Sequence, residues 1–393
     1  MGIKGFKFAA VEAAIKKPGR KDLALIYSET PAAVAAVFTT NKVKAAPVLL
    51  DEERVTSGTC RAVVVNSGNA NACTGAQGMA DARETARLVA GKLGVSEDAV
   101  LVASTGVIGV PLPMERLVEA VPALAANLGS GSLDDVAAAI MTTDTFPKME
   151  SRQGNAGGVT YTIAGVAKGA GMIMPNMATM LAFLVTDAAV AQDFLQRVFR
   201  TGVDRSFNAI TVDGDTSTND TSLIMANGEA GNPLLSEGSP DADQFTVLLN
   251  DVLLSLAKQI VRDGEGATKF VAITIKGAVS DAEAKQAAMA VANSNLVKTA
   301  FFGQDANWGR IFAAVGYSGV SVDQTRTELF FDDVRMVQRG IFAGGDAEAR
   351  GTEVLRNKEF SVTVDLKLGD GEATVYTSDL SYEYIKINAD YRT

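Results

Sequence analysis

The 393-residue chain contains one long segment without charge, between Lys168 and Asp187. Its length approaches that of a membrane-spanning helix. Two glycines, Pro175, Asn176 and two threonines interrupt the segment, so it is too polar and too irregular to cross a lipid bilayer. A buried strand–turn–strand fits the pattern better, and an apolar content of 47% supplies enough side chains for a sizeable core.

Patterns typical of helices alternate with patterns typical of strands along most of the chain. Helices are predicted at Met79–Leu93, which Gly94 ends, and at Asp241–Val261. Strands are predicted at Val159–Val166 and Phe270–Ile275. The alternation predicts an α/β or α+β fold with substantial antiparallel character.

The C-terminal part is richer in strand patterns. Apolar residues alternate over Phe360–Leu368, a glycine-rich turn follows at 369–371, and the alternation returns over Ala373–Thr377. This arrangement is typical of a β-hairpin. Tyr382–Asn388 is predicted as a further strand.

The chain has no histidine, which excludes Ser-His-Asp and Cys-His catalysis and imidazole metal ligands. A catalytic base would therefore be a carboxylate, a lysine, a tyrosine or an α-amino group. Cys60 and Cys73 are too few for a tetrahedral zinc site. We expect two reduced, buried, structural thiols in a cytosolic protein, and no metal.

Charge and motifs exclude several other classes of function. The net charge is −10, and basic residues cluster only briefly, at 16–21 and 262–269, so nucleic-acid binding is not expected. No segment has the pattern of a signal peptide or of a phosphate-binding P-loop. The acidic stretch Asp213–Asp220 resembles a calcium loop but lacks its glycine and final glutamate, so we interpret it as a polar turn.

The centre of the uncharged segment, Met177-Ala178-Thr179-Met180-Leu181, places a threonine among apolar residues. The residues alone leave open a packed core threonine and a functional one. The sequence resembles the self-cleavage site of the ornithine acetyltransferase family, the glutamate N-acetyltransferases of arginine synthesis. The resemblance spans nearly the whole chain, through segments at Asn66–Asn71, Ser104–Gly106, Thr142–Thr145, Phe207–Asn208, Asp213–Asp215, Gly303–Asp305, Asn307–Arg310 and Asn388–Thr393.

The resemblance implies that the chain cuts itself between Ala178 and Thr179. The products would be an α chain of residues 1–178 and a β chain of residues 179–393, associated in one fold as a heterotetramer of two α and two β chains. The implied fold has β-sheets sandwiched between helices, as in self-processing N-terminal-nucleophile enzymes. A smaller C-terminal α/β region is expected from about residue 280.

A freed N-terminal threonine explains how a chain without histidine could transfer an acyl group. Its α-amino group has a reference pKa of about 7.7–8.0 and could serve as the base for its own hydroxyl nucleophile. The resemblance assigns the oxyanion hole to Thr105 and Gly106. It assigns the substrate contacts to Thr142, Lys168, Thr179, Glu265, Asn388 and Thr393. A lysine suits a substrate carboxylate and a glutamate suits an ammonium group, although each residue taken alone also fits a structural role.

The implied reaction moves the acetyl group of N2-acetyl-L-ornithine to L-glutamate through an acetyl-threonine intermediate, giving L-ornithine and N-acetyl-L-glutamate. Acetyl-CoA as a further acetyl donor is left open, and no cofactor, membrane or nucleic-acid partner is implied. The expected location is the cytoplasm. Two alternatives remain: a self-processing amidase or aminopeptidase that passes the acyl group to water, and an amino-acid binder without chemistry.

Overall fold

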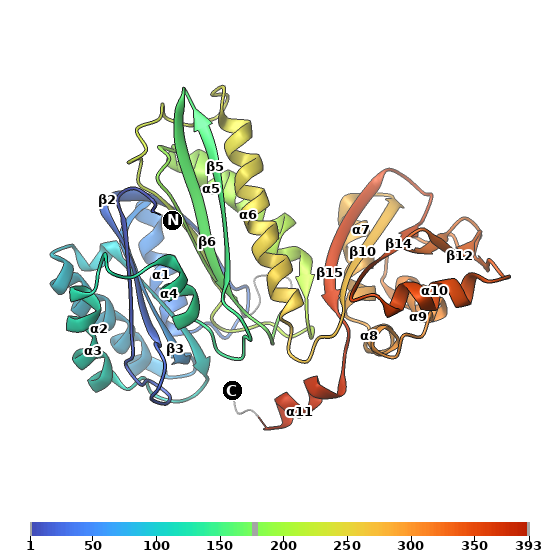
Figure 1. The fold of residues 1–393 in the computed structure, drawn as a ribbon, viewed down its shortest axis with the longest axis horizontal. Coiled ribbons are helices and arrows are strands. Elements are labelled where there is room, and N and C mark those ends of the chain that lie inside the picture. Colours follow the sequence, from blue (N-terminus) through green and yellow to red (C-terminus); the bar gives the residue numbers. More distant parts are fainter. Residues whose placement is uncertain (1, 175–179, 391–393) are drawn as a thin grey trace.

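The computed structural model of the chain describes residues 2–174 and 180–390. Its elements form two lobes, each built on one β-sheet, with the N-terminal lobe at the left of Figure 1 and the C-terminal lobe at the right. The C-terminal helix leaves the second lobe and extends towards the first. The predicted mixed α/β fold of sheets and covering helices is confirmed.

The first sheet has eight strands in the order β4-β3-β2-β9-β7-β6-β5, with β1 paired to β2. Their bounds are β1 Phe6–Val11, β2 Leu23–Phe38, β3 Thr59–Asn69, β4 Val100–Val107, β5 Lys148–Ala156, β6 Val159–Lys168, β7 Leu181–Thr186 and β9 Thr221–Ala226. The helices of this lobe are α1 Ala46–Arg54, α2 Gly75–Leu93, α3 Met114–Ala126, α4 Leu133–Ala139, α5 Gln192–Arg205 and α6 Ala242–Arg262.

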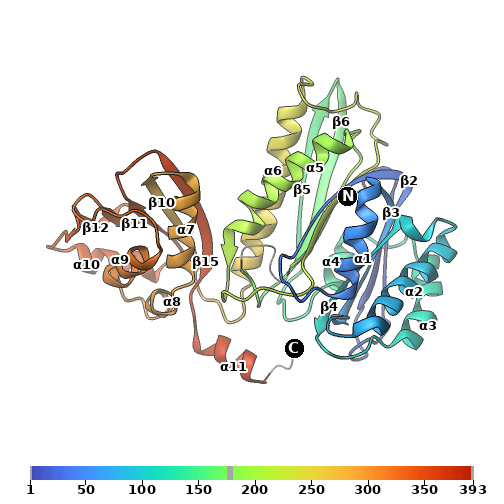
Figure 2. The same ribbon diagram turned by 180° about the vertical axis from the view of Figure 1, so that it is seen from behind.

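Strand β7 lies near the centre of this sheet and is buried along its whole length. It runs antiparallel to β6 and parallel to β9. Ala182 and Leu184 pack on the side of α5 and α6, which Figure 2 shows beside β5 and β6. Leu181, Phe183 and Val185 point to the opposite face and pack on the side of α4. The uncharged segment therefore contains one buried strand, β7. The strand that pairs with it, β6, ends at Lys168, where the uncharged segment begins.

The second sheet has seven strands in the order β13-β12-β11-β14-β10-β15-β8. Their bounds are β8 Ile210–Thr211, β10 Phe270–Ala278, β11 Glu328–Phe331, β12 Val334–Gln338, β13 Ile341–Phe342, β14 Glu359–Asp365 and β15 Gly371–Ser378. The helices are α7 Asp281–Ala292, α8 Asn295–Phe302, α9 Trp308–Tyr317, α10 Ala347–Arg356 and α11 Tyr382–Asp390.

Two predictions for the C-terminal part are wrong. β14 and β15 do not form a hairpin, because β10 lies between them, parallel to β14 and antiparallel to β15. Residues 382–390 form helix α11 instead of a strand. The Ser381 hydroxyl accepts a hydrogen bond from the Tyr384 amide at 3.4 Å, a contact that satisfies a backbone donor at the start of the helix.

The prediction of two buried thiols holds for Cys60 and is wrong for Cys73, which is exposed. Cys73 lies in the turn between β3 and α2 with a φ of 58°, outside the buried strand that carries Cys60. Among the described residues, no helix combines the length and the apolar character that crossing a membrane requires.

Candidate active site

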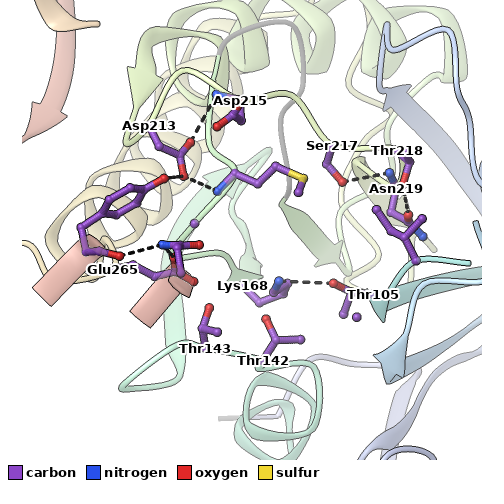
Figure 3. Close-up of a pocket in the computed structure, with 16 residues that line it drawn as sticks. Thr105, Thr142, Thr143, Lys168, Asp213, Asp215, Ser217, Thr218, Asn219 and Glu265 are labelled. Atoms are coloured by element: carbon purple, nitrogen blue, oxygen red, sulfur yellow. Dashed lines mark hydrogen bonds between the residues drawn. The ribbon is translucent and has the colours of Figure 1, made fainter. Parts of the chain in front are cut away.

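One pocket gathers six of the residues assigned from the sequence. They are Thr105 and Gly106 at the end of β4, Thr142 after α4, Lys168 at the end of β6, Glu265 after α6, and Asn388 on α11. Figure 3 shows Thr105 and Lys168 pointing towards each other, with Thr142 beside them. Ala178, Thr179 and Thr393 lie outside the described residues.

Gly106 occupies a place where no larger residue fits. Its φ is +136°, and an added Cβ atom would lie 2.3 Å from the carbonyl carbon of Gly68 and 2.5 Å from the amide nitrogen of Asn69. The glycine therefore allows β4 to approach β3 closely at the pocket. Thr105, which is almost fully buried, is presented beside it by the same strand.

Lys168 is the cation at the centre of the pocket, and only 3% of it is exposed. Its ammonium group donates a hydrogen bond to Thr105 Oγ1 at 3.3 Å. Burial lowers the pKa of Lys168, and the nearby Asp144 carboxylate opposes that shift. Because the Lys168 ammonium group can donate a hydrogen bond but cannot accept one, the hydrogen of the Thr105 hydroxyl remains available for donation into the pocket.

Asp144 holds three separate parts of the site together. Its carboxylate accepts hydrogen bonds from the Gly169 amide at 2.7 Å, the Thr142 amide at 2.9 Å and Lys148 Nζ at 2.7 Å. Burial raises the pKa of Asp144, but Lys168, Lys148 and the hydrogen bonds outweigh it, so that the pKa falls to about 2. The carboxylate therefore stays ionised and fixes both Thr142 and the residue after Lys168.

Lys148 extends this network to the end of α6. Its side chain is fully buried, and its ammonium group also lies 2.5 Å from Asp263. Asp263 in turn accepts hydrogen bonds from the amide and the hydroxyl of Thr145. Asp263 lies two residues before Glu265, so the network reaches the segment that carries Glu265.

Helix α11 supplies the far wall. Asn388 Nδ2 donates to Glu265 Oε2 at 2.8 Å, and the Tyr384 hydroxyl contacts Asp213 Oδ2 at 3.2 Å. The spacing of four residues places Tyr384 and Asn388 on the same face of the helix. Predicting a strand hid this relation, so Tyr384 was missed as a pocket residue.

The acidic turn that resembled a calcium loop supports the uncharged segment. Asp213 accepts hydrogen bonds from the amides of Met172 at 2.6 Å and Ile173 at 2.8 Å. Burial raises the pKa of the Asp213 carboxyl, which these amides only partly offset. Asp213 was also missed as a pocket residue, although its acidic pattern was visible in the sequence.

Asp220, at the other end of this turn, fixes the start of β7. Its Oδ1 accepts the Met180 amide at 2.8 Å, and the Thr221 amide donates to the Met180 carbonyl at 3.2 Å. Its Oδ2 is buried without a hydrogen-bond partner among the residues that the structure describes. Burial raises the pKa of Asp220 well above its usual range, with the Met180 amide and Lys168 opposing the shift.

The pocket thus combines a buried cation, a carboxylate, hydroxyl groups and a close-packed glycine. Such a set can bind a zwitterionic amino acid and stabilise an oxyanion. Within residues 2–174 and 180–390, no cluster of three or more Cys, Asp or Glu side chains is arranged to hold a metal ion.

Comparison with known proteins gives a consistent result. A profile of the ArgJ family matches residues 7–393. A relative from Geobacter sulfurreducens, named arginine biosynthesis bifunctional protein ArgJ, is 78% identical over the full length of both chains. The crystal structure of arginine biosynthesis bifunctional protein ArgJ from Bacillus halodurans is 40% identical and covers 53% of this chain and 98% of its own, with a TM-score of 0.52. The ornithine acetyltransferase of Mycobacterium tuberculosis, solved with ornithine, is 42% identical over 44% of this chain and 93% of its own, with a TM-score of 0.39. By sequence, this chain belongs to the ArgJ family.

Proposed function

We propose that the protein is an acetyltransferase of arginine biosynthesis that moves the acetyl group of N2-acetyl-L-ornithine to L-glutamate. The observation that supports the proposal most strongly is that Thr105, Gly106, Lys168 and Glu265 line the same pocket. In it, Lys168 would bind the substrate α-carboxylate and Glu265 the side-chain ammonium group. The name of the Geobacter sulfurreducens relative supports the assignment to arginine biosynthesis.

The first half-reaction begins at Thr179. Its hydroxyl oxygen attacks the acetyl carbonyl while its own α-amino group accepts the hydroxyl proton. The Gly106 amide and the Thr105 hydroxyl would donate hydrogen bonds to the oxyanion. The Thr105 hydroxyl can donate in this direction because its oxygen already accepts a hydrogen bond from Lys168. The C–N bond then breaks, the proton passes to the leaving amine, and ornithine departs from an acetyl-Thr179 ester.

The second half-reaction reverses these steps with glutamate as acceptor. The glutamate amine attacks the ester carbonyl, the C–O bond breaks, and Thr179 recovers its proton. The products are N-acetyl-L-glutamate and free enzyme. Thr142, Asn388 and Thr393 would complete the substrate contacts.

Self-cleavage before Thr179 would generate the required α-amino group. The Thr179 hydroxyl would attack the Ala178 carbonyl, and water would open the resulting ester. The Bacillus halodurans structure supports this proposal, because nearly its whole chain corresponds to 53% of this one, close to the share of residues 179–393.

The position of the cut favours a lasting association of the two products. β7 belongs to the product that begins at Thr179, yet it pairs with β6 of the other product along a buried sheet. Separating the products would expose the edge of β7 that pairs with β6 and the face of β7 that packs on α4. We propose a heterotetramer of two α and two β chains in the cytoplasm.

The rate of ornithine release from N-acetylornithine, with and without glutamate, tests the proposal against a hydrolase. We expect one equivalent of ornithine per active site without glutamate, followed by continued turnover when glutamate is added. Equally fast continued release without glutamate would identify an amidase. Thr179→Ala is the control, and it should neither be cut nor release ornithine.

A further inference from the structure

Helix α11 forms one wall of the pocket, yet none of its nine residues is buried. An isolated helix of this length is marginally stable in water. Tyr384 reaches the pocket through a hydrogen bond to Asp213, and Asn388 through one to Glu265. The position of this wall therefore depends on how the start of the helix is held.

The segment after α6 packs against the start of α11. The Ser381 hydroxyl donates a hydrogen bond to the Gly266 carbonyl at 2.6 Å. Gly266 has a φ of +67°, and an added Cβ atom would lie 2.4 Å from an amide nitrogen of α11, so only glycine permits this approach. The Asp379 carboxylate accepts hydrogen bonds from the amide of Thr268 at 2.8 Å and from its hydroxyl at 2.5 Å. The segment that carries Glu265 and the residues before α11 are therefore joined at two points.

A buried lysine on α8 holds the same connection from within the second lobe. Only 2% of Lys298 is exposed. Its ammonium group donates hydrogen bonds to Thr377 Oγ1 at 2.9 Å, to the Ser378 carbonyl, and to Ser378 Oγ at 3.4 Å. The backbone carbonyl of Lys298 accepts a hydrogen bond from the Leu380 amide at 3.2 Å. Lys298 thus holds the last two residues of β15 and the chain that leads from them to α11.

Burying an ammonium group at this place is unfavourable by itself. Burial lowers the pKa of Lys298 to about 7, while the carboxylates of Asp379 and Asp213 oppose this fall. A methionine would avoid the desolvation, but it could not donate hydrogen bonds to three oxygen atoms. Lys298 is absent from the described residues that line the pocket, so it can affect substrate binding only through the elements that it holds.

We propose that Lys298 is a positioning residue for substrate binding: it fixes where α11 leaves the second lobe and so places Asn388 against Glu265. The inference rests on the proposed function, in which Glu265 binds the ammonium group of N-acetylornithine. Without the Lys298 ammonium group, α11 would lose its fixed start, and the Glu265 carboxylate would lose the hydrogen bond from Asn388. Binding would suffer more than acetyl transfer, because the proposed oxyanion hole lies at the end of β4 in the first lobe.

Steady-state kinetics of Lys298→Met test this inference, with Lys269→Met as the matched control. Lys269 is another buried lysine of the second lobe, and its ammonium group donates to the carbonyls of Arg356 at 3.2 Å and Asn357 at 2.9 Å, at the end of α10. Both variants should lower the thermal unfolding midpoint. Lys298→Met should also raise KM for N-acetylornithine roughly fivefold and change kcat by less than about twofold. Lys269→Met should change neither constant by more than about twofold.

A double variant shows whether Lys298 acts through α11. Asn388→Ala alone should raise KM for N-acetylornithine roughly tenfold, because Glu265 loses its hydrogen bond. Adding Lys298→Met to Asn388→Ala should raise KM by less than about twofold more, since the same contact is already lost. Thr377→Val removes one acceptor of Lys298 and keeps the side-chain volume. It should raise KM by a smaller factor than Lys298→Met, and it tests the inference if Lys298→Met does not fold.

The possible results separate this inference from the proposed function. An unchanged KM in Lys298→Met, or in Thr377→Val if Lys298→Met does not fold, would overturn the inference and leave the proposed function intact. Factors in KM that multiply in the double variant would also overturn it, and so would equal changes in Lys298→Met and Lys269→Met. Absence of acetyl transfer from N-acetylornithine in the wild type would instead refute the proposed function.

Discussion

Replacing Lys148 by methionine would remove the cation that joins Asp144 to Asp263. Its ammonium group lies 2.7 Å from one carboxylate and 2.5 Å from the other, and all three side chains are essentially buried. Methionine keeps much of the side-chain volume but leaves both carboxylates without this partner. Breaking a buried ion pair from one side costs about 3–5 kcal/mol of unfolding free energy. For a chain of this length a loss of roughly 1 kcal/mol lowers the thermal unfolding midpoint by roughly 1 °C, so the midpoint should fall by about 5 °C.

The assay is thermal unfolding followed by far-ultraviolet circular dichroism, with Lys276→Met as the matched control. Lys276 lies 3.9 Å from Asp365, and 45% of its side chain is exposed, so its loss should cost less than about 1 kcal/mol. Adding Asp263→Asn to Lys148→Met should restore part of the lost stability, because it removes one uncompensated charge. Equal shifts of the midpoint in Lys148→Met and Lys276→Met would refute the reasoning.

Three further predictions concern individual site residues. Thr105→Val removes the proposed oxyanion donor and should lower kcat for acetyl transfer about a hundredfold with little change in KM. Thr105→Ser keeps the hydroxyl group and should retain most of the rate. Steady-state kinetics of both variants check this prediction. Glu265→Gln should raise KM for N-acetylornithine roughly tenfold, since the ammonium group loses its charged partner, and an unchanged KM would contradict this role. Asp144, with a pKa lowered from 3.8 to about 2, should contribute about 2 kcal/mol of stability above about pH 4, and this contribution should be lost as the pH falls towards 2. Unfolding midpoints between pH 5 and pH 2, as a rough range, should therefore fall more steeply for the wild type than for Asp144→Asn.

Helices and strands were predicted correctly where the segment itself contains the residues that start or end the element. Gly94 ends α2 with a left-handed φ of 67°, as expected. The predicted hairpin failed because β10 comes from far earlier in the chain and inserts between β14 and β15. Alternating apolar residues show that one face of a strand is buried. They do not show which strand pairs with it.

The candidate site shows a similar division. The resemblance assigned Lys168 and Thr105, but no local signal says that their side chains meet at 3.3 Å across the sheet. Tyr384 was missed because β-branched residues favoured a strand where Ser381 starts a helix. Asp220 was visible only as part of a polar turn, and its contact with Met180 depends on the pairing of β7 with β9.

The most direct test of the account is the intact mass of the purified protein before and after exposure to N-acetylornithine. We predict two chains, one of which begins at Thr179 and gains the mass of one acetyl group on that residue, then loses it when glutamate is added. A single uncut chain that is fully active, or an acetyl group carried on another residue, would contradict the acetyl-threonine mechanism.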